Sequence, residues 1–472
     1  MANKNFYITT TLPYVNASPH IGFALEITEA DVLARYHRLI GQKVIFNTGT
    51  DEHGQKIYQK AQAAQLKPQQ YCDQYAAKFA DLKKLLNLSY DHFIRTTDDH
   101  HVQAAQEFWQ RCQQNQDIYQ KLYQVKYCVG CELEKTDSEL KHGRCPLHPN
   151  QELEVREEEN YFFRFSKYQQ PLLELYQQQP EFVQPAGKMA EIVSFVQQGL
   201  QDFSISRLKT KMPWGIAVPG DPQHVMYVWF DALINYISTL GWPQQTQQFA
   251  KFWPGVQVAG KDNLRQQAAM WQAMLMSAGL ANSQKILING FISVAGQKMS
   301  KSLGNVIAPQ ELVDRYGIDA SRFLLINLGT FNEDMDVTWK RLDTEYTAHL
   351  ANGLGNLCSR VAKLAAQSQV PGQQPPSKFN PAYQKLFNNY QLTAALNWCW
   401  QQVQQADQYL SEQKPWQLQG QAQQQVLQQA IKQICQIGYH LQPFMPKTAA
   451  QLLNYFTQTQ LKALKPLFPR VG

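Results

Sequence analysis

The stretch FYITTTLPYVNASPHIGFALEITEADVLARYHRLIG, residues 6–41, is the part of this chain that best predicts its fold. Its first part, Phe6 to Pro13, has the composition of a buried strand. Ser18 is a suitable N-cap with Pro19 at the first helical position, and Gly41 ends an apolar-periodic helix. A buried strand that leads into such a helix is the repeating unit of a parallel α/β sheet.

Further strand-like segments alternate with helical stretches along the chain: Lys43–Thr48, Phe93–Thr97, Val256–Ala259 and Lys285–Asn289. This alternation favours a doubly wound parallel sheet of the Rossmann type. Residues 100–226 differ in texture, with clustered cysteines and an acidic run, so we interpret them as a domain inserted into the sheet. From residue 346 onward, glutamine-rich sequence keeps helical spacing, which predicts an α-helical bundle domain.

Composition limits the classes of protein that the chain can represent. Its 472 residues are enough for about three domains, and 44% hydrophobic residues can fill their cores. A net charge of +6 suits an anionic partner without proving one. The N-terminus lacks a signal-peptide pattern, and no apolar stretch is long enough to span a bilayer. We therefore predict a cytoplasmic protein without a membrane segment.

The cysteines indicate one metal site. Cys128-x-x-Cys131 and Cys145-x-x-His148 provide four soft or borderline ligands at the spacing of tetrahedral zinc, and the other cysteines are scattered. His142 is a rival fourth ligand, but it lacks the paired spacing. We predict one structural Zn²⁺ in a closed site, which would supply folding energy to a small insertion, and no disulfide framework.

Two short motifs are suited to hold polyphosphate: Pro19-His20-Ile21-Gly22 and Lys298-Met299-Ser300-Lys301-Ser302. A helix N-terminus offers free N–H groups and a positive dipole, so His20 is well placed to meet an anion. Gly22 removes a side chain where a flat base could approach the backbone. Lysines on a loop between glycines can supply charge to a pyrophosphate as it leaves. Taken alone, the first motif is also compatible with a capped turn, and the second with a basic loop.

In this order, the two motifs resemble the signatures of class I aminoacyl-tRNA synthetases. Further strings extend the resemblance over essentially the whole chain: Thr11–Asn16, Thr48–Gly54, Tyr227–Ala232 and Gly260–Asp262. Together they are similar to the bacterial type of methionyl-tRNA synthetase. The resemblance implies ATP-dependent attachment of methionine to its tRNA through a methionyl-adenylate intermediate.

The resemblance also implies a division of the chain. Residues 1–99 and 227–292 would be the two halves of the catalytic nucleotide-binding domain, and residues 100–226 the connective domain with its zinc knuckle. Residues 293–345 would carry the lysine loop and contact the tRNA stem, and residues 346–472 would form the helical anticodon-binding domain. The chain has no space for the C-terminal dimerising module that some family members carry, which predicts a monomer.

Individual roles follow from the same resemblance. The residues expected near ATP and Mg²⁺ are His20, Gly22, Phe23, Gly260, Asp262, Lys298, Ser300 and Lys301, of which His20, Lys298 and Lys301 would be catalytic. The residues expected around methionine are Leu12, Tyr14, Asp51, Trp229, Ala232, Tyr236, Asn263 and Gln267. A carboxylate can pair with the substrate ammonium, and aromatic rings suit a thioether. Without the resemblance, this aromatic cluster would be interpreted as ordinary core.

Asn356, Arg360 and Trp416 match the family residues that recognise the CAU anticodon of tRNA(Met). Asn356 and Arg360 are four residues apart, hence on one helix face. Unstacked bases are read by stacking on an aromatic ring and by hydrogen bonds from such side chains. The alternative for Trp416 is a place in the bundle core.

Three positions depart from the family pattern, and all three are expected near the substrates. Phe23 replaces the second histidine of the first motif, Asn263 replaces an apolar residue near the methionine side chain, and Gln267 replaces a histidine close to that pocket. These changes leave open a working enzyme with an altered inner shell, a synthetase selective for another amino acid, and a catalytically impaired protein that binds tRNA or the adenylate. We expect the working enzyme.

Overall fold

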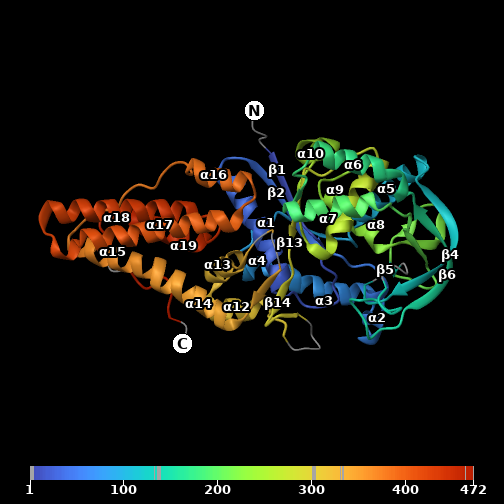
Figure 1. The fold of residues 1–472 in the computed structure, drawn as a ribbon, viewed down its shortest axis with the longest axis horizontal. Helices are drawn as coiled ribbons and strands as arrows, with labels where there is room; N and C mark the ends of the chain where they lie inside the picture. The colour runs from blue at the N-terminus through green and yellow to red at the C-terminus, as the bar shows by residue number, and fades with distance from the viewer. Residues whose placement is uncertain are drawn as a thin grey trace.

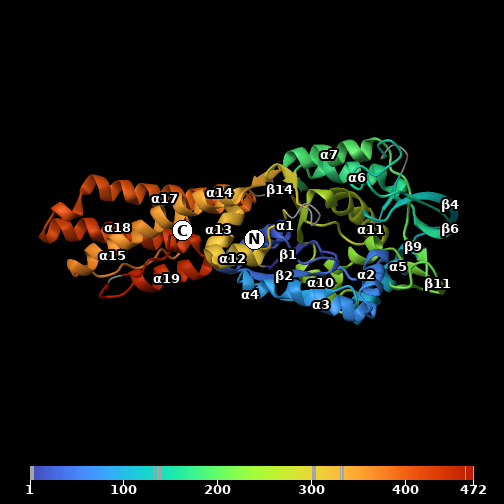
Figure 2. The same cartoon turned by 90° about the horizontal axis from the view of Figure 1, so that it is seen from below.

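The computed structural model describes residues 5–131, 133–135, 140–299, 305–329, 331, 334–462 and 464–470. The molecule is elongated, with an α/β part at one end and a helical bundle at the other (Figure 1). A second view at right angles shows the same separation (Figure 2). The bundle helices are α15 (Asn356–Gln367), α16 (Pro381–Asn388), α17 (Leu392–Gln413), α18 (Gly420–Leu441) and α19 (Pro446–Phe456).

A six-stranded parallel sheet forms the centre of the α/β part, in the order β3-β2-β1-β12-β13-β7. Its strands are β1 (Asn5–Thr10), β2 (Lys43–Thr50), β3 (His92–Arg95), β7 (Val183–Gln184), β12 (Val256–Gly260) and β13 (Lys285–Asn289). The five predicted strands are present, and the predicted fold class is confirmed. β7, from the stretch interpreted as an insertion, adds an edge strand. Strand order reverses between β1 and β12, which opens a crevice at their carboxyl ends.

Helices cover both faces of this sheet. Along β1, Phe6 and Ile8 belong to one apolar core and Tyr7 to another, as expected where successive side chains point to opposite faces. The first core continues through α1 (Ile21–Leu39), α12 (Pro309–Tyr316), α13 (Ile318–Leu328) and α14 (Trp339–Glu345) into the bundle. The second core holds α5 (Asp99–Gln114), α6 (Gln169–Gln178), α7 (Ala186–Gln197), α8 (Val228–Ala232), α9 (Asn235–Ser238), α10 (Thr246–Phe252) and α11 (Trp271–Ser277). A continuous apolar core therefore attaches the bundle to the sheet.

Helix α1 begins two residues later than the predicted start. Its N-cap is His20, with φ −124° and ψ 172°, and the prediction of Ser18 as N-cap and Pro19 as first helical residue is wrong. The His20 Nδ1 atom accepts a hydrogen bond from the Gly22 N–H at 3.0 Å. An N-cap normally supplies an oxygen for this purpose, and here an imidazole nitrogen satisfies one of the free donors of the first turn.

A buried ion pair joins α1 to α13 beside the segment that connects α18 to α19 of the bundle. The Arg322 guanidinium on α13 lies 2.8 Å from Asp31 of α1, and both side chains are fully buried. The same guanidinium donates to the backbone oxygens of Leu86, Pro443 and Phe444. Burying a guanidinium is costly unless its donors are paired, so these contacts fix how the bundle sits on the α/β part.

Smaller sheets and helices complete the fold. A long antiparallel hairpin, β4 (Ile118–Cys128) with β6 (Glu154–Phe163), lies at the end of the molecule opposite the bundle (Figures 1 and 2). The remaining strands are β5 (Leu133–Lys135), β8 (Phe203–Ser204), β9 (Ser206–Leu208), β10 (Ala217–Val218), β11 (Asp221–Met226), β14 (Ile292–Val294), β15 (Gln297–Lys298) and β16 (Met335–Val337). The remaining helices are α2 (Gln55–Ala63), α3 (Pro68–Ala80), α4 (Leu82–Leu85), the π-helical segments Gln266–Met270 and Tyr346–Gly355, and the 3₁₀ helices Phe165–Tyr168, Lys261–Asn263 and Pro415–Gln417. Across the described residues, none of the helices is both long and apolar enough to cross a membrane.

Candidate active site

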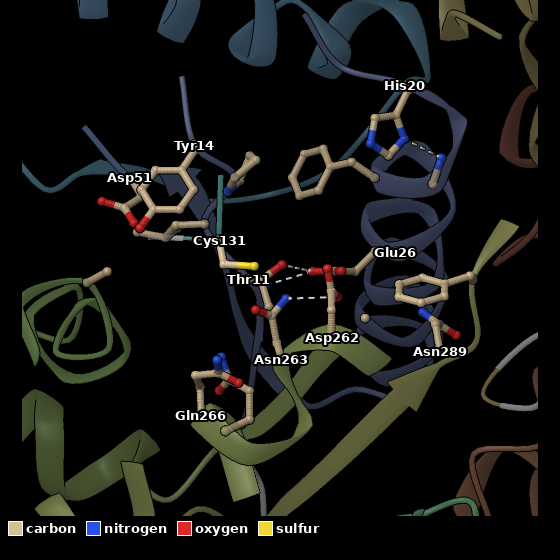
Figure 3. A pocket seen from close by; sticks show the side chains of 18 of the residues that line it. Thr11, Tyr14, His20, Glu26, Asp51, Cys131, Asp262, Asn263, Gln266 and Asn289 are labelled. Carbon is tan, nitrogen blue, oxygen red and sulfur yellow. Dashed lines mark hydrogen bonds between the residues drawn. The ribbon is translucent and has the colours of Figure 1, made fainter. Parts of the chain in front are cut away.

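A cavity of about 480 Å³ opens where the strand order of the central sheet reverses. Residues that follow β1, β2, β12 and β13 line it together with the start of α1. Figure 3 shows these side chains converging from α1 on one side and from the segment after β12 on the other. This is the position at which open α/β sheets bind their ligands.

The first sequence motif places an imidazole at the edge of this cavity. His20 and Gly22 both line it, and a Cβ atom on Gly22 would lie only 2.8 Å from His20 Cε1. Glycine is therefore needed for the ring to fold over the first turn of α1. Desolvation lowers the pKa of His20, opposed by the Asp262 carboxylate. Because Nδ1 accepts a hydrogen bond, the neutral ring carries its proton on Nε2, which can donate to a phosphate oxygen.

The second motif approaches the same helix end. Met299 lines the cavity, and its Cε atom lies 3.8 Å from the position of a Cβ on Gly22. On the other side of the loop, the Ile307 carbonyl accepts from the Ile21 N–H at 3.1 Å. Of the predicted loop residues, Ser300 and Lys301 lie outside the described residues, and Lys298 is described only through its backbone in β15. Met299, the described side chain of the second motif, therefore borders the same cavity as the first motif.

All eight residues predicted for the methionine site line this cavity: Leu12, Tyr14, Asp51, Trp229, Ala232, Tyr236, Asn263 and Gln267. The rings of Tyr14 and Trp229 meet edge to face, with centroids 6.4 Å apart. The Asp51 side chain is buried beside them, and its backbone N–H donates to Pro13 at 3.1 Å. An apolar aromatic slot with one buried carboxylate fits an amino acid whose side chain is apolar and whose ammonium needs a partner.

Two buried histidines support this slot, and the sequence did not reveal them. His53 Nδ1 and His101 Nε2 each lie 2.7 Å from a carboxylate oxygen of Asp231. Burial alone would raise the pKa of Asp231, but these histidines hold it below its ordinary value. Asp231 belongs to α8, which also carries Trp229 and Ala232, so this triad positions the helix that forms one wall of the slot.

Glu26 is a second residue that sequence reasoning missed. It lines the cavity from α1, and its Oε1 accepts from the backbone N–H and the hydroxyl of Thr11, at 2.7 and 2.6 Å. Burial raises the pKa of Glu26 to about 7. Glu29, one turn further along, is fully buried and accepts from the Asn289 amide. Charged residues are rarely buried, so carboxylates among the apolar residues of the predicted helix could have drawn attention to Glu26 and Glu29.

The three departures from the family pattern occupy different surroundings. Phe23 lines the cavity but is only 8% exposed and meets Phe79 edge to face at 5.6 Å, so it is also a core residue. Asn263 lies beside Asp262 at the cavity wall (Figure 3). Gln267 is buried and donates from Nε2 to the Tyr236 hydroxyl at 2.6 Å. All three therefore line the cavity, and their proximity to the substrates stays a prediction.

The four predicted metal ligands come together next to the cavity. The ligand atoms of Cys128, Cys131, Cys145 and His148 all lie within 4.8 Å of one another, and Cys131 Sγ is 3.2 Å from His148 Nδ1. Three thiols and one imidazole form a donor set that suits a closed tetrahedral metal site. The rival ligand His142 lies outside this group, exposed on the adjoining turn.

This Cys₃His knuckle forms part of the cavity wall. Gly130, Cys131, Leu147 and His148 line the cavity, and Cys131 points into it in Figure 3. A Cβ atom on Gly130 would lie 2.4 Å from the His148 ring, so glycine permits this close approach. The Lys56 ammonium, which also lines the cavity, donates to the Gly130 carbonyl at 3.3 Å. The shape of the cavity therefore depends on the knuckle.

Two of the three predicted anticodon residues meet in the bundle. The Arg360 guanidinium of α15 lies 5.6 Å from the centre of the Trp416 ring, and Arg360 Nη1 is 2.8 Å from Asp407. Trp416 is 47% exposed, unlike the core position considered as its alternative. Asn356 begins α15 and is exposed. An exposed ring with an adjacent guanidinium can accept an unstacked base.

Known proteins resemble the chain over nearly its whole length. A sequence model of the family described as "tRNA synthetases class I (M)" matches residues 6–153 and 134–362. Methionine--tRNA ligase from Synechocystis sp. is 42% identical, covering 95% of this chain and 88% of its own. The same-named protein from Thermosynechococcus vestitus is 48% identical, covering 79% of this chain and 72% of its own.

Solved structures agree with these relatives. Methionyl-tRNA synthetase of Mycobacterium tuberculosis in complex with methionyl-adenylate superposes with a TM-score of 0.90 at 33% identity, covering 99% of this chain and 100% of that one. The apo form of the same protein gives a TM-score of 0.82 at 30% identity, covering 99% of this chain and 98% of its own. The overall arrangement described above is therefore more similar to the adenylate-bound form than to the free one.

Proposed function

Since this chain belongs to the class I methionyl-tRNA synthetases, we propose that its central cavity joins methionine to AMP and passes the methionyl group to tRNA. The observation that carries the proposal is the convergence of an aromatic, carboxylate-bearing slot, the first phosphate motif and Met299 of the second on one cavity at the reversal of the sheet. An amino acid and a nucleotide bound there would lie side by side.

The reaction has two steps, and neither requires a covalent bond to the protein. The methionine carboxylate attacks the α-phosphate of ATP in line, and pyrophosphate leaves. A terminal ribose hydroxyl of tRNA then attacks the carbonyl of methionyl-adenylate, and AMP leaves. The protein contributes position and charge to both steps.

The family resemblance assigns the roles, and the places of the described residues support them. Asp51 pairs with the substrate ammonium, while Leu12, Tyr14, Trp229, Ala232 and Tyr236 hold the side chain. The Nε2–H of His20 donates to the phosphates, and Gly260 and Asp262 lie near the ribose. Lys298, Ser300 and Lys301 serve the departing pyrophosphate, with Lys298 supporting the closed loop. Mg²⁺ accompanies ATP and supplies further positive charge.

We also propose that Cys128, Cys131, Cys145 and His148 hold one structural Zn²⁺. When bound, the ion cross-links a small segment with little core of its own. All four positions are filled by protein, which leaves the ion no open site for substrate. The knuckle instead contributes backbone and side chains to the cavity wall.

At the other end of the molecule, Asn356, Arg360 and Trp416 read the CAU anticodon of tRNA(Met), by stacking and hydrogen bonds. Three further properties stay predictions from the sequence: the domain boundaries, a monomeric state and a cytoplasmic location.

Methionine-dependent ATP–pyrophosphate exchange tests the proposal, followed by charging of tRNA(Met). Two histidines at opposite ends of α1 offer a matched pair: His20 caps the helix and lines the cavity, whereas His37 lies in the last turn and stacks on Phe6. His20→Ala should lower the exchange rate roughly 10²- to 10³-fold, the usual cost of one donor to the transition state, and His37→Ala should leave it nearly unchanged. Absence of exchange with methionine in the unaltered protein would favour the impaired binding protein. Exchange with a different one of the twenty amino acids would favour altered selectivity.

A further inference from the structure

A contact just outside the cavity joins two segments of its wall. Strands β12 and β13 are neighbours in the central sheet, and their ladder ends at the pair Gly260 and Asn289. After β12 the chain enters the cavity wall with Asp262 and Asn263, which are labelled in Figure 3. After β13 it enters the wall with residues 290–292. Past the last pair the two segments no longer share a ladder, so other contacts must set the distance between them.

Asp334, from a third segment, bridges these two. The Lys261 ammonium lies 2.5 Å from both oxygens of the Asp334 carboxylate, and Lys261 directly precedes Asp262 of the cavity wall. Oδ1 of the same carboxylate accepts from the Phe291 backbone N–H at 2.9 Å. Lys261 and Asp334 are not among the residues that line the cavity, whereas Phe291 is. The bridge therefore acts from behind the wall.

Phe291 makes further contacts with the same two partners. Its ring lies beside the Lys261 ammonium, which is 4.2 Å from the ring centre. Its carbonyl accepts at 2.8 Å from the N–H of Met335, the residue that follows Asp334. From there β16 runs parallel to β14, with Ile292 opposite Met335. Two consecutive residues therefore hold both the N–H and the C=O of Phe291.

The ion pair between Lys261 and Asp334 is better defined than most contacts of its kind. Surface ion pairs usually contribute little, because water screens them and two flexible side chains must be ordered. Here the Lys261 side chain is 24% exposed and that of Asp334 is 56% exposed. The ring of Phe291 confines the ammonium, and its N–H confines the carboxylate. Lys261 and this N–H lower the pKa of Asp334, so the carboxylate is ionised at neutral pH.

We propose that Lys261 and Asp334 are positioning residues for the nucleotide, because their ion pair sets the distance between the segments that follow β12 and β13. The proposal rests on the function proposed above, in which Gly260 and Asp262 lie near the ribose. Most of the methionine slot, in contrast, follows β1 and β2 or belongs to α8. Loss of the ion pair should therefore weaken the binding of ATP more than that of methionine.

The test measures KM for ATP and KM for methionine separately in ATP–pyrophosphate exchange. Lys261→Met removes the ammonium from a long side chain, and Asp334→Asn removes the charge but keeps an oxygen for the Phe291 N–H. Each variant should raise KM for ATP about three- to tenfold and change KM for methionine less than about twofold. Lys261→Arg should keep KM for ATP near that of wild type, because a guanidinium can also pair with both carboxylate oxygens.

Lys188 provides the matched control. Its ammonium acts electrostatically on Asp334, as that of Lys261 does, but it pairs with Glu191 of its own helix α7 at 2.5 Å. Lys188→Met removes the same charge without breaking the bridge, and it should leave KM for ATP within about twofold of wild type. The double variant Lys261→Met/Asp334→Asn should resemble either single variant, because both substitutions remove one interaction.

An unchanged KM for ATP in Lys261→Met overturns the proposal. An equal rise in both KM values also overturns it, because that result would show a general disturbance of the cavity. A double variant whose effect is the product of the two single effects would show that the residues act independently. An equal rise of KM for ATP in Lys188→Met would show that charge alone is responsible.

Failure of the proposed function appears differently, as a wild type that shows no methionine-dependent exchange. Calorimetric titration with ATP then decides about the ion pair. Lys261→Met should raise the Kd for ATP about three- to tenfold, and an equal Kd in variant and wild type would refute the positioning role.

Discussion

Replacing Trp416 by alanine should separate the two ends of this enzyme. The ring lies beside Arg360 in the bundle, whereas the cavity lies in the α/β part. These two parts form opposite ends of the molecule (Figure 1). If Trp416 stacks on an anticodon base, Trp416→Ala should impair charging of tRNA(Met) and leave methionine-dependent ATP–pyrophosphate exchange intact.

The expected magnitudes follow from exposure. With 47% of the residue exposed, roughly 100 Å² of the ring is buried in the free protein, which bounds the loss of unfolding free energy at about 3 kcal/mol. Domains of ordinary stability tolerate such a loss. The lost stacking amounts to about 1–3 kcal/mol, so kcat/KM for tRNA should fall roughly 5- to 150-fold.

Aminoacylation kinetics with tRNA(Met) and exchange kinetics without tRNA are the two assays. Trp398→Ala is a matched control, because Trp398 lies in the same bundle but packs against Tyr383 and His440. The control should lose stability without a selective loss of charging. Equal losses of exchange and charging in Trp416→Ala, or equal effects of the two variants on charging, would refute the assignment of Trp416 to the anticodon.

Three other perturbations have defined outcomes. Burial raises the pKa of Glu26 to about 7, so this carboxyl loses its proton at lower pH in the unfolded chain than in the folded protein. The free energy of unfolding therefore falls as pH rises from about 4.5 to about 7. In urea denaturation, the free energy of unfolding of Glu26→Gln relative to that of wild type should therefore increase by up to about 3 kcal/mol across that window. Parallel pH dependences of the two free energies would contradict the raised pKa. Phe23→His should raise the exchange rate while lowering the free energy of unfolding, since a donor enters the cavity and contact with Phe79 is lost; an unchanged rate would place Phe23 outside the ATP site. Chelation of the metal should increase amide hydrogen exchange around Cys131 and raise KM for methionine or ATP, because the knuckle lines the cavity. Unaltered KM values would show that the cavity wall keeps its structure without metal.

Much of the candidate site could be predicted from the sequence. The Cys₃His knuckle was predictable because its ligands occur in two short pairs, and the chain itself holds such pairs close together. The parallel sheet was predictable from the alternation of strands and helices. The helix start was predicted two residues early, because the residue that caps it is an imidazole and not the usual hydroxyl or carboxylate.

Assigning residues to the methionine slot depended on family resemblance, because an aromatic cluster has the same composition in a core and in a pocket. The structure resolves this ambiguity for Tyr14 and Trp229, whose rings border a cavity. It also shows that Arg360 and Trp416 meet, although they are far apart in the chain. Contacts of this kind depend on how elements pack and leave no periodic pattern in the sequence.

The amino-acid sequence thus specified the local features of this protein: strand and helix order, the ligand pairs and the two phosphate motifs. All depend on neighbours within a few residues, where backbone geometry restricts what a given residue type can do. The raised pKa of Glu26, the Asp231 triad and the hydrogen bond from Gln267 to the Tyr236 hydroxyl came from the three-dimensional arrangement alone. Burial and hydrogen-bond partners arise between segments that the chain brings together from distant positions, so they exist only once the fold has formed.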